Sequence, residues 1–302
     1  MNILISGSTG FIGQHLVQRL KQGHHTIKVL SRNGARASQK LDVSAYSWNY
    51  AKEEVPPEAL ENIQAIIHLM GENLGSGRWT KERKREIYES RILSTRKLVE
   101  AAPPGLECFI CASAIGIYPG QGDDIYDESY MVPSQGSFMQ TICRDLEMEA
   151  SKIERKNVRC VSIRTGVVLG HGGMLERLLP IFKLSLGGPI GDGQQWLPWI
   201  HIHDLVSVYT TAAQDTRYRG PINAVSPNPV RYREFATLLG KALHRPAFFP
   251  TPAFILKLIL GEASALALNS YHVVPTKLLQ VYGYEFKFNN LSAALDDLFR
   301  KG

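Results

Sequence analysis

The sequence predicts an α/β protein in which helices cover both faces of a parallel sheet and a smaller C-terminal lobe follows. Short apolar runs alternate with helical patterns as far as Gly170, which is typical of strand–helix–strand units. A glycine-rich turn follows the first apolar run directly, and glycine and proline become frequent after Gly170. We therefore expect one domain over residues 1–170 and a lobe over residues 171–302, with segments that can interleave.

The individual elements follow from the spacing of the apolar residues. We expect strands at residues 2–6, 26–31, 65–70, 107–113 and 158–164. Helical spacing predicts helices at residues 10–22, 81–102, 138–155, 204–214, 232–243 and 291–300. Gly23 stands where the first helix should end, a common position for glycine.

Composition and charge are those of an ordinary globular protein. The chain has 302 residues, 44% of them hydrophobic, and a formal net charge of +6, which suits an anionic small molecule as partner. The one concentrated basic run, residues 81–85, is interpreted as a solvated helix face rather than a nucleic-acid surface. The apolar stretch 252–268 contains charged residues and is too short to cross a bilayer. We expect neither nucleic acid nor a membrane as a partner.

The four cysteines bear on the compartment. They stand in a long chain with no secretory signal, which is typical of reduced thiols, so we expect a cytoplasmic protein. Cys108 and Cys111 lie three residues apart in an expected strand, and an odd offset points the two side chains to opposite faces. We interpret both as core residues rather than as a redox pair.

The glycine turn predicts a dinucleotide site. Gly7, Gly10 and Gly13 follow the first strand and open the first helix. Glycine is needed there because the turn requires unusual backbone angles and the chain must approach a pyrophosphate closely. The phosphates would lie on free N–H groups at the helix N-terminus. The expected contacts of this turn are Gly7, Ser8, Thr9, Gly10, Phe11, Ile12 and Gly13.

The end of the second strand predicts which dinucleotide binds. A carboxylate there would bind the ribose 2′-hydroxyl of NAD, but the sequence has Ser31 and Arg32. A guanidinium can bind a 2′-phosphate in a bidentate manner, and the serine offers a hydroxyl. We therefore expect NADP(H) as the cofactor.

Several motifs together resemble an atypical extended short-chain dehydrogenase/reductase. They include the glycine turn, the strand end at residues 68–73, the segment 112–114, the segment 164–166 and the segment 199–204. Residues 78–80, 90–91 and 187–191 narrow the resemblance to the sugar-nucleotide-epimerase-like "epimerase family" within the epimerase/dehydratase superfamily. The resemblance covers nearly the whole chain. It implies a Rossmann fold and an oxidoreductase or isomerase acting on a small molecule that resembles a nucleotide sugar.

The resemblance also implies further cofactor contacts at the end of the third expected strand and on the helix that follows. These are Leu69, Met70, Gly71, Glu72, Glu86, Arg91 and Val168. Without the resemblance, Glu86 and Arg91 would be interpreted as surface residues of a helix. It further implies that the helices at residues 81–102 and 138–155 could pair two copies of the chain in a homodimer.

The catalytic residues of such enzymes are incomplete in this sequence. The family uses a serine or threonine, a tyrosine that exchanges a proton with substrate, and a lysine four residues later that lowers the tyrosine pKa. Ser113 suits the first role, but Phe138 and Ile142 occupy the other two positions. Tyr118, expected on a loop above the sheet, is the first replacement candidate, with a packing tyrosine as the alternative. Glu72 is the second.

Three further interpretations remain open. His201, His203 and Asp204 lie close together in the sequence, as metal ligands can. No further cluster of candidate ligands accompanies them, so we expect no metal. Aromatic and guanidinium groups suited to a cleft wall occur at Arg78, Trp79, Trp196 and Trp199, though they could equally anchor loops. The complete cofactor motif favours an NADP(H)-dependent oxidoreductase or epimerase, whereas the missing tyrosine and lysine favour a non-catalytic NADP(H)-binding redox sensor.

Overall fold

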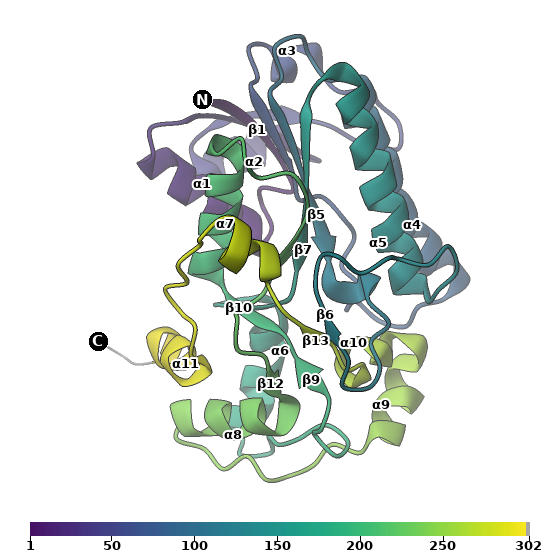
Figure 1. Ribbon diagram of the computed structural model, residues 1–302, viewed down its shortest axis with the longest axis vertical. Coiled ribbons are helices and arrows are strands. Elements are labelled where there is room, and N and C mark those ends of the chain that lie inside the picture. Colours follow the sequence, from purple (N-terminus) through teal and green to yellow (C-terminus); the bar gives the residue numbers. More distant parts are fainter. Residues whose placement is uncertain (300–302) are drawn as a thin grey trace.

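The computed structural model describes residues 1–299, and its centre is a sheet of seven parallel strands (Figure 1). The strand order is β11-β7-β5-β4-β1-β2-β3, and every pairing between neighbours is parallel. The strands are β1 (Asn2–Ser6), β2 (Thr26–Ser31), β3 (Ser44–Ser47), β4 (Ala65–His68), β5 (Cys108–Ala114), β7 (Arg159–Thr165) and β11 (Gly220–Ala224). This order is that of a doubly wound Rossmann sheet, which confirms the predicted fold class.

Helices cover both faces of the sheet because consecutive strand residues point to opposite sides. Ile3 and Ile5 pack with α1 (Phe11–Gln22), α2 (Gly34–Leu41) and α7 (Ile202–Gln214) on one face. Leu4, between them, packs with α3 (Pro57–Leu60), α4 (Lys81–Glu100) and α5 (Phe138–Ser151) on the other. The strands are therefore buried on both sides, as a parallel sheet requires.

The direction of chain crossing reverses between β1 and β4. The chain leaves β1 toward β2 and β3 on one side, and β4, β5, β7 and β11 extend the sheet on the other. Ligands of open α/β sheets bind at such a point, beyond the carboxyl ends of the strands. The turn after β1 and the loops after β4 and β5 therefore lie around the expected site.

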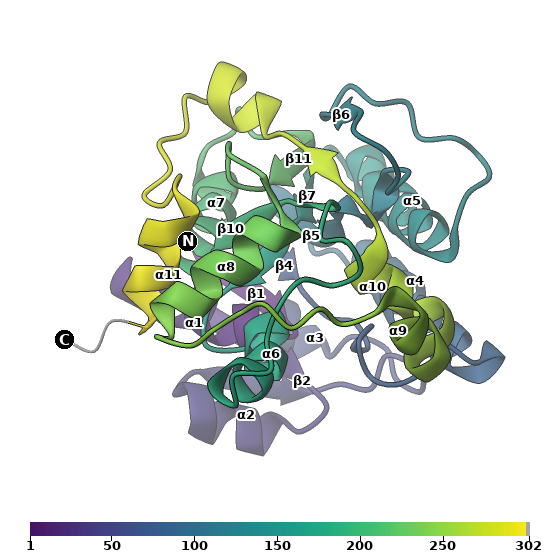
Figure 2. The same cartoon turned by 90° about the horizontal axis from the view of Figure 1, so that it is seen from below.

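The rest of the chain forms a smaller lobe, which Figure 2 shows from below. Its helices are α6 (Gly173–Lys183), α8 (Tyr232–Ala242), α9 (Ala253–Leu260), α10 (Ala265–Leu268) and α11 (Leu291–Phe299). Two-stranded pairs join β8 (Val167–Leu169) to β10 (Trp199–His201), β9 (Trp196–Leu197) to β12 (Val230–Arg231), and β6 (Ile125–Tyr126) to β13 (His272–Val273). The core of this lobe includes Phe182, Phe235 and Leu295.

Residues 171–302 do not form one separate lobe. Strand β11 pairs with β7 at the edge of the main sheet, and α7 packs against α1. After Gly170 the chain thus returns to the main sheet. The sheet with its helices and the smaller lobe, the two units of the fold, therefore interleave. Neither β11 nor β3 follows from the sequence pattern, because β3 is short and only half-buried and β11 begins with Gly220 and Pro221.

The other predicted elements match closely. Strands β1 and β2 have the predicted bounds, and the remaining predicted strands differ by one or two residues. The helix expected at 138–155 ends at Ser151 and continues as a 3₁₀ turn, η2 (Lys152–Lys156). The predicted end of the last helix, Arg300, lies outside the described residues.

A buried imidazole lies beneath the site. His68, the last residue of β4, lies between the hydroxyls of Ser6 on β1 and Ser94 on α4, at 2.5 and 3.1 Å. Burial, with a smaller contribution from Arg91, lowers the pKa of His68 to about 3. The ring is therefore neutral in the folded protein, whereas an unfolded histidine titrates near pH 6.5.

We predict an acid-dependent loss of stability from this group. The unfolded chain binds a proton that folded His68 refuses, so its contribution is complete above pH 6.5 and is lost as the pH falls toward 3. Between pH 7 and pH 5 the loss amounts to about 2 kcal/mol. Urea unfolding at the two pH values should therefore show a smaller difference for His68→Gln than for the natural chain. His244→Gln, at an exposed position, is the control, and an unchanged difference in His68→Gln would contradict the prediction.

Candidate functional site

The turn after β1 lies so close to neighbouring backbone atoms that its glycines leave no room for a side chain. Gly7 has φ +73°, and a Cβ there would lie 2.7 Å from the carbonyl carbon of Leu69. A Cβ on Gly13 would lie 2.5 Å from the carbonyl oxygen of Gly7. The turn is closed by a hydrogen bond from the Gly10 N–H to the Gly7 carbonyl, 3.1 Å long. Glycine is thus required for reasons of space as well as conformation.

The same turn presents polar groups at the N-terminus of α1. Helix α1 begins at Phe11, and no side chain caps it. The hydroxyl of Ser8 is buried and has no hydrogen-bond partner among the described residues. Buried hydroxyls are nearly always paired in proteins. A pyrophosphate would accept from Ser8 and from the free N–H groups of the helix, so this cradle fits a dinucleotide.

The end of β2 fits a 2′-phosphate. The Arg32 side chain is 85% exposed, and its guanidinium lies 3.9 Å from the carboxylate of Glu72 in the neighbouring loop after β4. The Ser31 hydroxyl accepts a long hydrogen bond from the Asn33 N–H, and Asn33 caps α2 through its side chain. Arg36, in the first turn of α2, is also exposed and was not predicted. The loop carries no carboxylate of its own, so the residues present fit NADP(H).

The loop after β4 is held by α4. The Arg91 guanidinium donates to the Glu72 carbonyl at 3.0 Å, and a Cβ on Gly71 would lie 2.8 Å from that guanidinium. Burial lowers the pKa of Arg91, against the raising influence of Cys143 and Glu72. Arg91 is therefore no surface residue: it fixes the loop in which Gly71 and Glu72 lie.

An ion-pair cluster surrounds the Glu72 carboxylate. Arg83 donates to Glu72 at 3.2 Å and to Glu86 at 2.9 Å, and Arg32 approaches Glu72 from the other side. Glu86 is itself mostly exposed. These ion pairs hold the Glu72 carboxylate in place in the loop after β4.

The remaining predicted cofactor contacts lie after β4, at the start of α1 and on β8. Leu69 and Met70 follow β4 and are half-buried, and the Leu69 N–H donates to the carbonyl of Ser6. The Phe11 ring packs beneath the loop after β8, where a Cβ on Gly172 would lie 2.6 Å from it. Val168 on β8 is also half-buried. Thr9 is exposed and Ile12 half-buried at the start of α1.

Ser113 lies inside a buried polar network. Its hydroxyl donates to Glu147 of α5 at 2.6 Å, and Ser113 is 5% exposed. The same carboxylate accepts two hydrogen bonds from Arg164 of β7, at 3.0 and 2.9 Å. Glu147 was not predicted, since it lies nine residues beyond Phe138 with no motif to mark it. The single proton of the Ser113 hydroxyl is directed into the fold.

Tyr118 belongs to the same network and lies in the loop that follows β5. It follows a 3₁₀ turn, η1 (Ile115–Ile117), and is fully buried. Its hydroxyl accepts from Arg164 at 3.0 Å and donates to Asn223 of β11 at 2.7 Å. Burial raises the pKa of Tyr118 to about 12, against the lowering influence of Arg164. The buried position of Tyr118 matches the alternative given above, a tyrosine that packs inside the fold.

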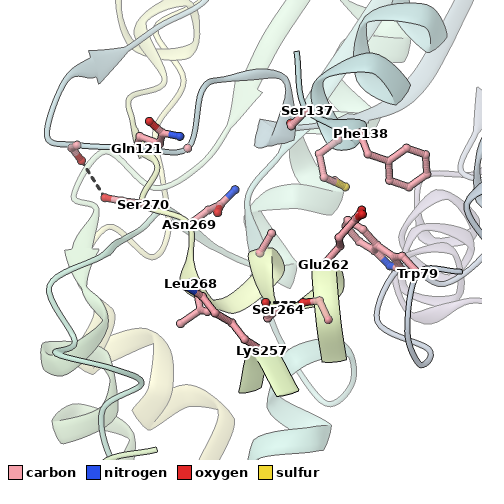
Figure 3. Close-up of a pocket in the computed structure, with 15 residues that line it drawn as sticks. Trp79, Gln121, Ser137, Phe138, Lys257, Glu262, Ser264, Leu268, Asn269 and Ser270 are labelled. Carbon is pink, nitrogen blue, oxygen red and sulfur yellow. Dashed lines mark hydrogen bonds between the residues drawn. The ribbon is translucent and has the colours of Figure 1, made fainter. Parts of the chain in front are cut away.

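A cavity of about 830 Å³ opens between the two units, near the start of α5 (Figure 3). Trp79, Phe138 and Glu262 lie on one side of it, and Gln121, Asn269 and Ser270 on the other. The full lining is Trp79, Gly120, Gln121, Gly122, Ser137, Phe138, Met139, Lys257, Gly261, Glu262, Ser264, Ala265, Leu268, Asn269 and Ser270. Neither Tyr118 nor Glu72 belongs to it.

Phe138 and Ile142 differ in their surroundings. Phe138 is the first residue of α5 and faces the cavity. Ile142, one turn later, is 2% exposed and packs in a cluster with Ile87 and Ala263. An apolar residue fits that cluster, where a lysine would bring a desolvated charge.

Only one of the four predicted wall residues lines the cavity. Trp79 does, and its indole N–H donates to the carbonyl of Leu74. Arg78 instead donates to the carbonyls of Leu258 and Ile259 at the end of α9. Trp199 is a fully buried core residue, and Trp196 is stacked between other side chains beside the cavity. The anchoring alternative therefore describes these three better.

His201 and Asp204 have structural roles at the start of α7. His201 caps α7 by accepting from the His203 N–H, and burial lowers its pKa to about 4. Asp204 accepts from the backbone N–H groups of Lys287 and Phe288, both at 2.9 Å. Among the described residues no group of three or more His, Cys, Asp or Glu side chains is placed to hold a metal ion.

The basic run and the cysteines are also integrated in the fold. Arg83 and Lys84 are half-buried and ion-paired, so the run is not merely a solvated face. Cys108 and Cys111 are buried with free thiols whose pKa values burial raises to about 11 and about 12. No described helix is both long enough and apolar enough to cross a membrane.

Comparison with known proteins extends these findings. The chain is 38% identical to "Epimerase family protein SDR39U1 homolog, chloroplastic" of Arabidopsis thaliana, over 98% of this chain and 86% of that protein. It is 35% identical to "Epimerase family protein YfhF" of Bacillus subtilis, over 99% and 98%. The crystal structure of human epimerase family protein SDR39U1 (isoform2) with NADPH matches with a TM-score of 0.89 and 31% identity, covering 99% of both chains.

Two family descriptions match the chain. Residues 251–298, which include α9 to α11 and one wall of the cavity, match a domain of unknown function, DUF1731. Residues 3–224 match the NAD dependent epimerase/dehydratase family. The resemblance predicted from the motifs is confirmed, and the chain belongs to the NAD dependent epimerase/dehydratase family.

Proposed function

We propose that this protein is an NADP(H)-dependent oxidoreductase that acts on a small molecule held in the cavity between its two units. The observation that carries the proposal is the unpaired, buried Ser8 hydroxyl in a glycine turn, with the Arg32 guanidinium at the end of the neighbouring strand. The human relative solved with NADPH supports it. When bound, the nicotinamide supplies or accepts a hydride.

The protein's own side chains bind and orient the cofactor and the substrate rather than exchange protons with the substrate. Ser8 and the N-terminus of α1 hold the pyrophosphate, and Arg32 holds the 2′-phosphate. Phe138 closes the cavity where the family has its tyrosine, and its ring has no exchangeable proton. Protons would therefore move between substrate and water, and this favours net oxidation or reduction over epimerisation, which must return hydrogen to a retained intermediate.

A second candidate function is a non-catalytic NADP(H)-binding redox sensor. The observation that favours it is the buried state of both Ser113 and Tyr118. The cavity of about 830 Å³ between the two units favours the enzyme, since a sensor needs no space for a substrate.

The cofactor assignment predicts a selective loss in Arg32→Ala. The variant should bind NADPH about tenfold more weakly, the cost of one charge-assisted phosphate contact, and should bind NADH unchanged. Calorimetric titration with both nucleotides measures this. Arg19→Ala is the matched control, because Arg19 is an exposed arginine near the other end of α1. Equal losses for both nucleotides, or no binding of NADPH to the natural chain, would contradict the assignment.

The oxidoreductase assignment is tested by following NADPH absorbance with a panel of aldehydes, ketones and quinones. At least one class should be reduced, and Tyr118→Phe should retain that turnover and its affinity for NADPH. The same variant should lower the free energy of unfolding by about 1–3 kcal/mol, because Asn223 loses its buried hydrogen-bond donor and Arg164 its acceptor. Tyr46→Phe, at a half-buried tyrosine of β3 outside the Ser113–Glu147–Arg164–Tyr118 network, is the stability control. Bound NADPH without turnover of any compound would favour the sensor.

A further inference from the structure

The cavity has an aromatic and apolar wall. The rings of Trp79 and Phe138 meet edge to face with centroids 5.3 Å apart, and both line the cavity together with Met139 and Leu268 (Figure 3). Flat aromatic or unsaturated molecules gain dispersion and burial energy from such a wall. The lining residues come from the start of α5 and from the segment 257–270, so a ligand would touch both units.

The charges that line the cavity are few. Among the residues that line it, Lys257 is the one cation and Glu262 the one anion. Glu262 is ion-paired with Lys84 of α4, whose ammonium also lies 5.2 Å from the centre of the Phe138 ring. Lys257 has no ion-pair partner among the described residues. One uncompensated positive charge is therefore offered to a ligand.

Two arginines that adjoin the cavity lining are bound to protein groups. Arg78, adjacent to Trp79, donates to two backbone carbonyls of α9. Arg231, close to the Gly122 side, pairs with Asp123 at 2.9 Å and stacks on Trp196 at 4.0 Å. A guanidinium engaged in this way cannot present its planar fork to a phosphate without losing those contacts.

The geometry points to a flat, largely apolar ligand with a single anionic group, and not to a nucleotide sugar, in this cavity. This inference rests on the proposed function. A nucleotide sugar brings a diphosphate, whose several negative charges proteins commonly pair with arginine or lysine side chains, whereas Lys257 is the one cationic side chain among the residues that line this cavity. The single anionic group would lie at Lys257. The side-chain amides of Gln121 and Asn269, which also line the cavity, would bind an uncharged oxygen.

Calorimetry on the full chain saturated with NADPH tests the inference. The probes are naphthalene carboxylate, naphthyl methanol, UDP-glucose and UDP-glucuronic acid. We expect both naphthalene probes to bind, the carboxylate more tightly, and both UDP-sugars to bind more weakly than either. Tighter binding of a UDP-sugar, or no binding of either naphthalene probe, would overturn the inference.

Matched variants locate the binding. Lys257→Gln should weaken the carboxylate about tenfold and leave naphthyl methanol unchanged, whereas Lys241→Gln, at an exposed lysine of α8, should change neither. Phe138→Ala should weaken both naphthalene probes, and Phe248→Ala, at an exposed phenylalanine outside the cavity, should not. Equal effects in a variant and its control would place the probes elsewhere and overturn the inference. Titration with NADPH alone reports separately on the proposed function, so failure of one is distinguishable from failure of the other.

Discussion

The close approach of the turn after β1 to the end of β4 is the constraint on which the site depends. Side chains at Gly7 or Gly13 would overlap the backbone of Leu69 or of Gly7 itself. Because the turn is this tight, α1 begins immediately and directs its free N–H groups over the sheet. The loops after β2 and β4 come together at the same place, where the Arg32 guanidinium lies 3.9 Å from the Glu72 carboxylate.

The polar residues that a sequence motif would nominate for catalysis have a second physical role here. Ser113, Glu147, Arg164 and Tyr118 form a hydrogen-bonded chain from β5 through α5 to β7. A buried guanidinium and carboxylate are tolerated only when their hydrogen-bonding capacity is satisfied, and the serine and tyrosine hydroxyls provide that satisfaction. The network therefore ties the carboxyl ends of β5 and β7 to α5, while Phe138 presents an apolar surface to the cavity.

Much of the fold, and the tight glycine turn between β1 and α1, could be predicted from local sequence, because each depends on short-range rules. Short runs of apolar residues indicate β1 and β2, and the spacing of three glycines after a strand identifies the turn. The cavity could not be predicted, since Lys257 and Glu262 lie more than a hundred residues beyond Phe138. The same reason explains Tyr118 and Trp199: distance along the chain gives no information about which aromatic residues tertiary packing buries. Strand β11 was missed because its pairing with β7, not its composition, makes it a strand.

The most direct test of this account is a crystal structure of the protein with NADPH. The account predicts the pyrophosphate over the turn from Gly7 to Gly13, with the Ser8 hydroxyl donating to it and the Arg32 guanidinium on the 2′-phosphate. The nicotinamide should reach the cavity beside Phe138. A pyrophosphate placed elsewhere, or a nicotinamide directed away from the cavity, would contradict it.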